Sequence, residues 1–268
     1  MPSCVLPFES SPSPKDMESL FDRCHQRRFV HPDPLEFVWR FSLADDQEVV
    51  GLLAASLAFG RVRSILNSVE KVLFALGSHP AATIDSGNRN DEQELLASFV
   101  HRYARGEHLV ELLEGIRRTR RTFGSLQGAF LAHLTPDADS TLPALQGFVK
   151  ELSAHFTNPR NPLLPDPGGP SACKRLHLFL RWMVRHDEVD PGPWREIPSS
   201  LLVVPLDVHM HRMARMYGWT HRASADRKAA LEVTGALRVF DPQDPVRFDF
   251  SLTRPGIWGR GTEPSGEH

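Results

Sequence analysis

Hydrophobic residues recur at intervals of three and four along most of the chain, which is the spacing of amphipathic helices. Proline and glycine interrupt this pattern at helix-length intervals, and runs that alternate like strands are nearly absent. We therefore predict an all-α protein. A short helix is expected to open at Asp33 and Pro34, and longer helices are expected at residues 45–60, 61–76, 91–104, 107–123, 126–134, 142–156, 171–185, 207–216, 225–240 and 245–253.

The helix predicted to start at Asp45 has the clearest boundary signals. Asp45 is expected to be its N-cap, Glu48 follows three residues later as in a capping box, and Gly60 is expected to end it. Its high content of apolar residues indicates a helix in the protein core.

Two segments depart from the helical pattern. Residues 158–170 contain five prolines and two adjacent glycines, so they are predicted to form a loop. Residues 201–206 are an extended apolar approach to Asp207, where the next helix begins. We expect a disordered N-terminus at residues 1–14, a single helical domain at 15–258 and a disordered tail at 259–268.

Charge and composition narrow the possible partners. The net charge is −2, but only five of the 31 basic residues are lysine and the other 26 are arginine, the planar donor suited to phosphate. Many arginines gather at residues 102–121 and 174–185, a pattern typical of a solvated helix face or of a nucleic-acid surface. The chain lacks an apolar run long enough to span a membrane and a signal sequence, so we expect a soluble, cytoplasmic protein.

Familiar metal and cofactor motifs are missing from the sequence. The three cysteines are scattered, and His209 and His211 are two residues apart, which places them on different sides of a helix. The P-loop, the dinucleotide fingerprint, the nucleophile elbow and the zinc-protease motif are also absent. We therefore expect neither a metal nor a cofactor.

Two turns that lead into helices carry the residues best suited to chemistry. Lys174 follows the turn at Gly168 and Gly169, where the positive end of the helix dipole and the charge of Arg175 favour its neutral, nucleophilic amine. The alternative is that Lys174 and the turn hold an anion or face water. Asp207 is either a functional carboxylate or an ordinary helix cap.

The sequence PLDVHM at 205–210 resembles the P-x-D-[TV]-H-[VI] segment of the helix-hairpin-helix DNA glycosylases, the superfamily of endonuclease III and the 8-oxoguanine glycosylases. The resemblance implies that Lys174 is the nucleophile and Asp207 its acidic partner. The usual L-P-G-V-G-x-K hairpin is replaced by residues 164–174, and 33 residues separate Lys174 from Asp207, more than is usual. The long interval is similar to that of the archaeal 8-oxoguanine glycosylase branch.

Longer segments of the chain resemble a bacterial family that carries a domain-of-unknown-function label. This resemblance extends from Phe29 to Ile257 and rests on PDPLEFVWRF, EVVGLLAASLAFGR, SACKRLHLFLRWMVR and DPVRFDFSL. It bears more on the fold than on the activity, because a shared fold does not bring a shared site with it.

The glycosylase resemblance implies a fold, a partner and a set of contacts. We expect two helical subdomains with a helix-hairpin-helix element and a cleft between them, acting as a monomer on double-stranded DNA with a damaged base. The base would be flipped out and 8-oxoguanine excised through a lysine Schiff base, followed by cleavage at the abasic site. The expected DNA contacts are Gly168, Gly169, Ser171, Arg175 and Arg212, with Arg181 and Arg215 as further charges, and the expected base contacts are Gln47 and Asp249.

Three alternatives stay open at this point. The protein could be a glycosylase or lyase for another lesion. It could be a non-catalytic helical nucleic-acid-binding module in which Lys174 contacts a phosphate and Asp207 only caps a helix. A protein-interaction scaffold is favoured by the near-neutral net charge and disfavoured by the arginine clusters.

Overall fold

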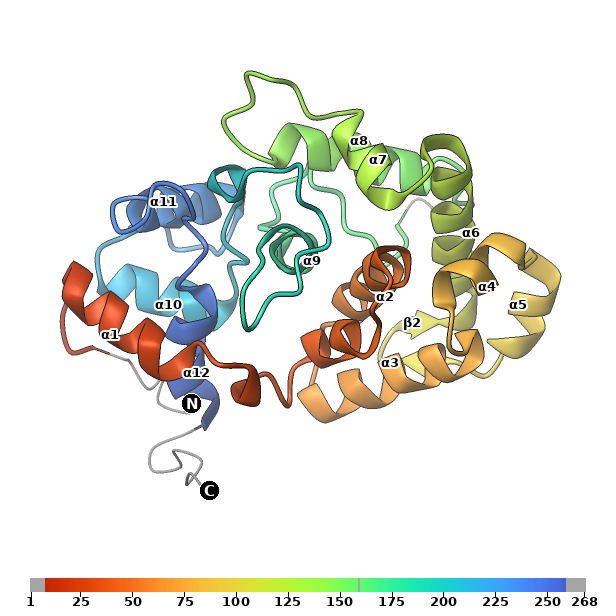
Figure 1. Ribbon diagram of the computed structural model, residues 1–268, viewed down its shortest axis with the longest axis horizontal. Helices are drawn as coiled ribbons and strands as arrows, with labels where there is room; N and C mark the ends of the chain where they lie inside the picture. Colours follow the sequence, from red (N-terminus) through yellow and green to blue (C-terminus); the bar gives the residue numbers. More distant parts are fainter. Residues whose placement is uncertain (1–7, 159, 259–268) are drawn as a thin grey trace.

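The computed structural model describes residues 8–158 and 160–258, and it confirms the predicted all-α fold (Figure 1). Within these residues the β structure consists of two strands of two residues each and one isolated bridge. The α-helices are α1 Pro14–Cys24, α2 Ala44–Ser56, α3 Val62–Leu76, α4 Pro80–Ser86, α5 Arg89–Leu95, α6 Gly106–Phe123, α7 Leu126–Leu131, α8 Leu142–Ser153, α9 Lys174–Val184, α10 Val208–Met216, α11 Arg227–Leu237 and α12 Asp249–Trp258. Short 3-10 helices η1, η2 and η3 lie at Arg27–Phe29, Pro34–Arg40 and Ser199–Leu201.

Helices from the two ends of the chain lie together on one side of the molecule. In Figure 1, α1, α10, α11 and α12 gather on the left, where α1 packs against α12, whereas α3 to α6 lie at the opposite side and α7 and α8 run along the top. Helix α9 lies between these groups and packs against α2. The residue that opens α9, Lys174, is therefore carried by a helix in the middle of the fold.

An aromatic cluster fixes the position of α9. Trp194 is 1% exposed and makes edge-to-face contact with Phe148 and Phe179, with ring centroids 6.3 and 5.2 Å away. Close packing also joins α9 to α2, because a Cβ atom added at Gly51 would lie 2.6 Å from Cε of Met183. Burial of such large side chains contributes about 1.5–3 kcal/mol each, so α9 is firmly anchored.

The predicted capping of α2 is wrong, since Leu43 is the N-cap and no side chain caps the helix. Glu48 is 2% exposed and accepts hydrogen bonds from the backbone N–H groups of Leu126 and Gln127, at 2.8 and 3.0 Å. It also pairs with Arg120 at 2.7 Å. A buried carboxylate needs such donors, and the first N–H groups of α7 supply them.

The predicted helix at 91–104 is wrong in its second half. Helix α5 ends at Leu95, and two strands follow, β1 Val100–His101 and β2 Ala104–Arg105, which pair in antiparallel register. Arg102 in the turn has a φ of 55°, a left-handed conformation that no helix continues. Helices α1 and α4 were not predicted at all; α4 has seven residues, too few for a clear periodic pattern.

The expected disordered ends fall partly outside the described residues, since residues 1–7 and 259–268 are not described. Helix α1 begins at Pro14, capped by Ser13 and Asp16 in a capping box. Phe8 is hydrogen-bonded to the Tyr217 hydroxyl at 3.1 Å. In the described part of the chain, the helices are too short or too polar to cross a lipid bilayer.

Candidate active site

The loop before α9 is held in place by α11. The backbone N–H of Arg227 donates to the Pro170 carbonyl at 2.9 Å, and the Arg227 side chain donates to the Gly168 carbonyl at 3.1 Å. Within the loop, the N–H groups of Gly168 and Gly169 donate to Asp166, at 2.7 and 3.4 Å. The two glycines expected to bind phosphate through these N–H groups therefore already have partners inside the loop.

Lys174 is the first residue of α9, and the residue before it sets its direction. Cys173 is the N-cap and has a φ of 44°, a left-handed conformation that turns the chain sharply into the helix. Its backbone N–H donates to Oγ of Ser171 at 3.2 Å, so the exposed Ser171 supports the turn. The Lys174 side chain remains 39% exposed and is thus open to a substrate.

Lys174 and Asp207 meet, as the resemblance implies. Nζ of Lys174 donates to Oδ2 of Asp207 at 3.1 Å. The other oxygen, Oδ1, accepts the backbone N–H groups of His209 and Met210 at 2.9 and 2.8 Å, so Asp207 also caps α10. The two interpretations of Asp207 that the sequence left open are compatible, because each uses a different carboxylate oxygen.

The surroundings keep Asp207 ionised. Burial raises its pKa, but the positive charge of Lys174 and the Met210 N–H group outweigh burial and leave the pKa below its usual value. Leu206, which precedes Asp207, is 2% exposed, so the backbone that carries the carboxylate is held in place by packing. The pair is accordingly an ordered ion pair at the protein surface.

A buried charge network lies close to this pair. Arg181 is 3% exposed and donates to Asp249 at 2.7 Å and to Asp190 at 2.9 Å. Burial raises the pKa of Asp249 above its ordinary value, although the positive charge of Arg181 acts to lower it. The charge of Asp207 also raises this pKa, and that of Lys174 lowers it. Helix α12, which begins at Asp249, packs against α10, which begins after Asp207, so the network lies beside the helix that Asp207 caps.

The structure changes the expected roles of several residues in this region. Arg181 is enclosed by carboxylates inside the protein, so its expected contact with phosphate is wrong. Asp249, expected at the base, is 4% exposed and occupied by Arg181. Gln47, the other expected base contact, is half-buried and donates through Nε2 to the Phe41 carbonyl at 2.8 Å.

Arg175 is bound within the protein. Its Nη2 donates to the Pro162 carbonyl at 2.7 Å, and Nη1 donates to the Ser56 carbonyl. The guanidinium lies 4.8 Å from the centre of the Phe59 ring. These contacts tie α9 to the end of α2 and use the donors that were expected to face DNA.

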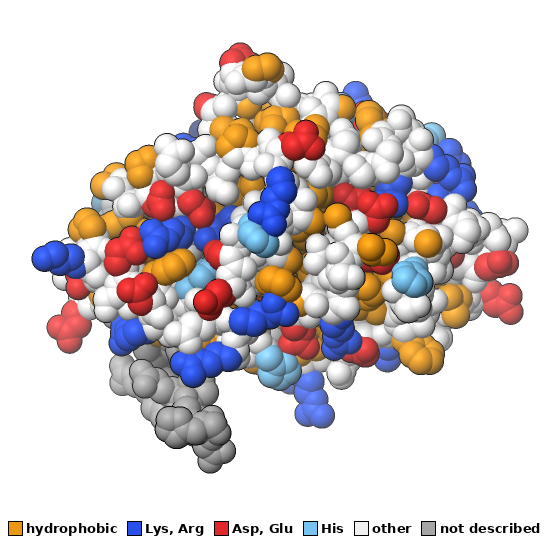
Figure 2. Space-filling view, viewed as in Figure 1, with side chains coloured by type: hydrophobic (Ala, Val, Ile, Leu, Met, Phe, Trp, Pro, Cys, Tyr) orange, Lys and Arg blue, Asp and Glu red, His pale blue; other side chains and the backbone are white. Residues whose placement is uncertain are grey.

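Other arginines of the two basic stretches also face inward. Arg117, Arg120 and Arg185 are each no more than 6% exposed and are paired with carboxylates. On the face shown in Figure 2, acidic and basic side chains lie interspersed. The sequence could not separate these internal arginines from surface ones, because helical spacing does not show which of them the fold buries, and some of their partners, such as Glu48 for Arg120 and Asp244 for Arg185, lie far away in the chain.

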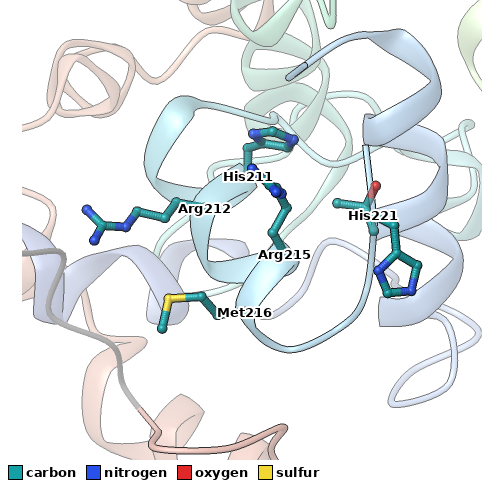
Figure 3. Close-up of a pocket in the computed structure, with 6 residues that line it drawn as sticks. His211, Arg212, Arg215, Met216 and His221 are labelled. Carbon is teal, nitrogen blue, oxygen red and sulfur yellow. The ribbon is translucent and has the colours of Figure 1, made fainter. Parts of the chain in front are cut away.

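Of the arginines expected to contact DNA, Arg212 and Arg215 are left exposed by the structure, and both lie on α10. With His211, Met216, Thr220 and His221 they line an open hollow of about 340 Å³ (Figure 3). Among the described residues, no three histidine, cysteine, aspartate or glutamate side chains come together to hold a metal ion.

Comparisons with known proteins give a family without a named activity. Residues 33–258 match the model of a family described as "Protein of unknown function (DUF2400)". This range agrees with the one expected from the sequence, but it does not link the chain to the helix-hairpin-helix glycosylases. The chain matched no curated protein and no solved structure.

Proposed function

Because this chain belongs to the DUF2400 family, whose description assigns no activity, we propose its function from the site itself: a DNA glycosylase that also cleaves at abasic sites. The substrate is double-stranded DNA with a damaged base, and 8-oxoguanine is the lesion implied by the resemblance to the archaeal branch. Lys174 acts as the nucleophile and Asp207 as its acidic partner.

The observation that carries the proposal is the contact between Lys174 Nζ and Asp207 Oδ2 at 3.1 Å. A lysine nucleophile needs a nearby group that takes its proton, and it must be reachable. Both conditions hold, since the Lys174 side chain is 39% exposed and that of Asp207 is 23% exposed. The PLDVHM segment that places Asp207 is the same segment that resembles the glycosylases.

The first step is attack of the neutral Lys174 amine on C1′ of the damaged nucleotide. A bond forms between the lysine nitrogen and C1′ while the bond from C1′ to the base breaks, and the base leaves with that electron pair and takes up a proton. Asp207 Oδ2 accepts the proton that Lys174 must lose. When DNA covers the pair and excludes water, both charged forms become less favourable, which promotes this transfer.

The second step cleaves the strand. Asp207 first passes its proton to the departing base and is ionised again. The bond from C1′ to O4′ then breaks, O4′ takes up the proton that the lysine nitrogen loses, and the adduct becomes a protonated imine between Lys174 and C1′, whose positive charge the Asp207 carboxylate stabilises. Loss of a proton from C2′ then breaks the bond from C3′ to oxygen and expels the 3′ phosphate. The damaged nucleotide must be extruded from the duplex beforehand, because a side chain cannot reach its C1′ atom while the base is stacked in the helix.

Borohydride trapping tests this proposal, because borohydride reduces an imine to a stable amine. We expect a covalent complex with an 8-oxoguanine duplex and with an abasic duplex, and its complete loss in Lys174→Gln. Lys150→Gln is the matched control, since Lys150 is an exposed lysine on α8. No complex on either duplex with the wild-type protein would overturn the lysine mechanism.

A non-catalytic nucleic-acid-binding module is the second candidate. It is favoured by the cap that Asp207 Oδ1 provides to His209 and Met210, which gives this carboxylate a structural use without any chemistry. In this case Lys174→Gln lowers DNA affinity modestly, and no covalent complex forms with either duplex.

A further inference from the structure

The hollow on α10 carries positive charge that the protein itself leaves unmatched. Arg212 and Arg215 are both exposed, and in the described part of the chain neither forms an ion pair with a carboxylate. Arg181 and Arg185, in contrast, are fully enclosed by acids. Two adjacent arginines without acidic partners favour an anionic ligand.

Histidines and a hydroxyl complete the lining of this hollow. His211 is 8% exposed, and its Nε2 faces the Arg222 carbonyl at 3.0 Å, so Nε2 carries a hydrogen. His221 is exposed on the segment after α10 (Figure 3). The Thr220 hydroxyl lies at the same hollow and donates to Glu232.

The carboxylates nearest in the chain are already engaged. Glu232 accepts from Thr220, and Asp226 is bound by Arg222 at 2.8 Å and also caps α11. The charge that faces the open space therefore comes from the arginines. In Figure 3, Arg212 extends away from His221, so the positive groups are spread across the hollow rather than directed at one point.

The hollow has a defined position relative to the candidate active site. Asp207 is the N-cap of α10, and Arg212 and Arg215 follow it by five and eight residues. At 1.5 Å per residue these positions lie roughly 7 and 12 Å further along the helix axis. Nucleotides rise 3.4 Å each along one strand, so this separation corresponds to roughly two to four nucleotides.

We propose that this hollow binds the phosphate backbone of DNA, two to four nucleotides from the sugar that faces Lys174. The ligand is a strand of phosphodiesters rather than one phosphate ion, because the positive side chains are spread along α10. The position of this strand relative to the damaged nucleotide rests on the proposed function above. Binding of DNA at the hollow does not depend on that function and is measured separately.

The test is the salt dependence of DNA affinity, measured by fluorescence anisotropy with an undamaged duplex on which no chemistry occurs. Each lost phosphate contact lowers the slope of log affinity against log salt by about 1. We expect a decrease of about 1 for Arg212→Ala and for Arg215→Ala, and about 2 for the double variant. Thermal unfolding checks that these exposed substitutions leave the fold intact.

Arg195→Ala is the matched control. Arg195 is exposed and has no carboxylate partner among the described residues. The residue before it bonds to the Met183 carbonyl, so Arg195 lies at the end of α9 opposite Lys174. Its substitution removes the same charge and is expected to leave the slope unchanged. Equal slopes for the Arg195, Arg212 and Arg215 variants would overturn the proposal.

Inorganic phosphate separates a backbone site from a site for free phosphate. If inorganic phosphate stabilises the wild type but not Arg215→Ala while the DNA slopes stay equal, the hollow takes free phosphate and the proposal is wrong. Borohydride trapping distinguishes the proposal for the hollow from the proposed lysine mechanism. If the Arg212 and Arg215 variants have lower slopes but the wild type gives no trapped complex, the result supports DNA binding at the hollow and overturns the lysine mechanism. If the wild type gives a trapped complex but the slopes of the variants are equal, the result supports the lysine mechanism and overturns the proposal for the hollow.

Discussion

Lys174 and Asp207 form an ion pair at 3.1 Å although 33 residues and the whole of α9 separate them in the chain. The contact exists because two independent turns end at the same place. Cys173 turns the chain into α9 so that Lys174 is its first residue, and a buried extended segment brings Asp207 to the start of α10. The position of each residue is therefore determined by the backbone and not by the flexibility of its side chain.

Asp207→Asn separates the chemical role of this residue from its role as a cap. Asparagine is as good an N-cap as aspartate, so the free energy of unfolding is expected to change little. The carboxylate that accepts the Lys174 proton is lost, and we expect single-turnover excision to slow by about 10²- to 10⁴-fold. Asp207→Ala additionally removes the cap and is expected to cost about 1 kcal/mol in urea unfolding. An unchanged excision rate in Asp207→Asn would show that this carboxylate takes no part in the reaction.

Asp249→Asn distinguishes a buried supporting residue from a base contact. The change weakens the pairing with Arg181, so we expect lower stability in urea unfolding. Because an abasic site has no base, a base-contacting residue affects excision of 8-oxoguanine but not trapping on an abasic duplex. We expect Asp249→Asn to lower the two rates by similar factors. Selective loss of excision would restore Asp249 to the role that the sequence suggested.

Glu48 stabilises the junction of α2, α6 and α7 from inside the core. Its oxygens accept two backbone N–H groups and pair with Arg120. In Glu48→Ala the two N–H groups lose this acceptor and Arg120 loses one of its carboxylate partners, although Asp45 and Asp85 remain. Removal of one partner from a buried charge network costs about 3–5 kcal/mol. Glu70→Ala is the control, because Glu70 pairs with Arg40 at the exposed surface and such pairs contribute about 0.2–1 kcal/mol. Urea unfolding that shows equal losses for the two variants would contradict this account.

His177 makes stability depend on pH below neutrality. It is 2% exposed on α9, and burial lowers its pKa from 6.5 to about 4. Between these values the unfolded chain takes up a proton and the folded protein does not, so stability is complete above pH 6.5 and is lost as the pH falls toward 4. The contribution amounts to roughly 3 kcal/mol, by 1.36 kcal/mol per pKa unit.

His177→Phe is the variant that isolates this effect. Nδ1 of His177 is buried and has no hydrogen-bond partner in the part of the chain that the structure describes, so an apolar ring is expected to be tolerated at neutral pH. Urea unfolding at pH 7.5 and pH 5 is expected to show a smaller loss of stability in the variant than in the wild type. Parallel losses would assign the pH dependence to other groups.

The fold class was predictable from local signals, whereas the pairing of Lys174 with Asp207 was implied by the resemblance of PLDVHM to the glycosylases. Helical periodicity indicated the all-α class. The helix α10 was expected to begin at Asp207, and Asp207 is its N-cap. The turn at Arg102 was not predictable, because a left-handed arginine has no sequence signature comparable to that of glycine. Glu48 was misread because the donors it binds follow it by 78 and 79 residues.

The residues around the pair were harder to predict for a similar reason. Arg181 and Arg175 lie in a basic stretch of the sequence, but each is bound in part by a group from a distant part of the chain, Asp249 for Arg181 and the Ser56 carbonyl for Arg175. Sequence shows that a charge is present but not whether an internal partner has already neutralised it. Arg212 and Arg215 are distinguished from these only by their exposure and by their lack of acidic partners among residues 8–158 and 160–258.

The most direct test of the account is to trap the protein on an abasic duplex with borohydride and to locate the modified residue by peptide mass spectrometry. An abasic duplex removes any dependence on the identity of the lesion. We expect a reduced sugar adduct on the peptide that contains Lys174, and none in the Lys174→Gln variant. An adduct on another lysine, or no adduct at all, would contradict the assignment of Lys174 as the nucleophile.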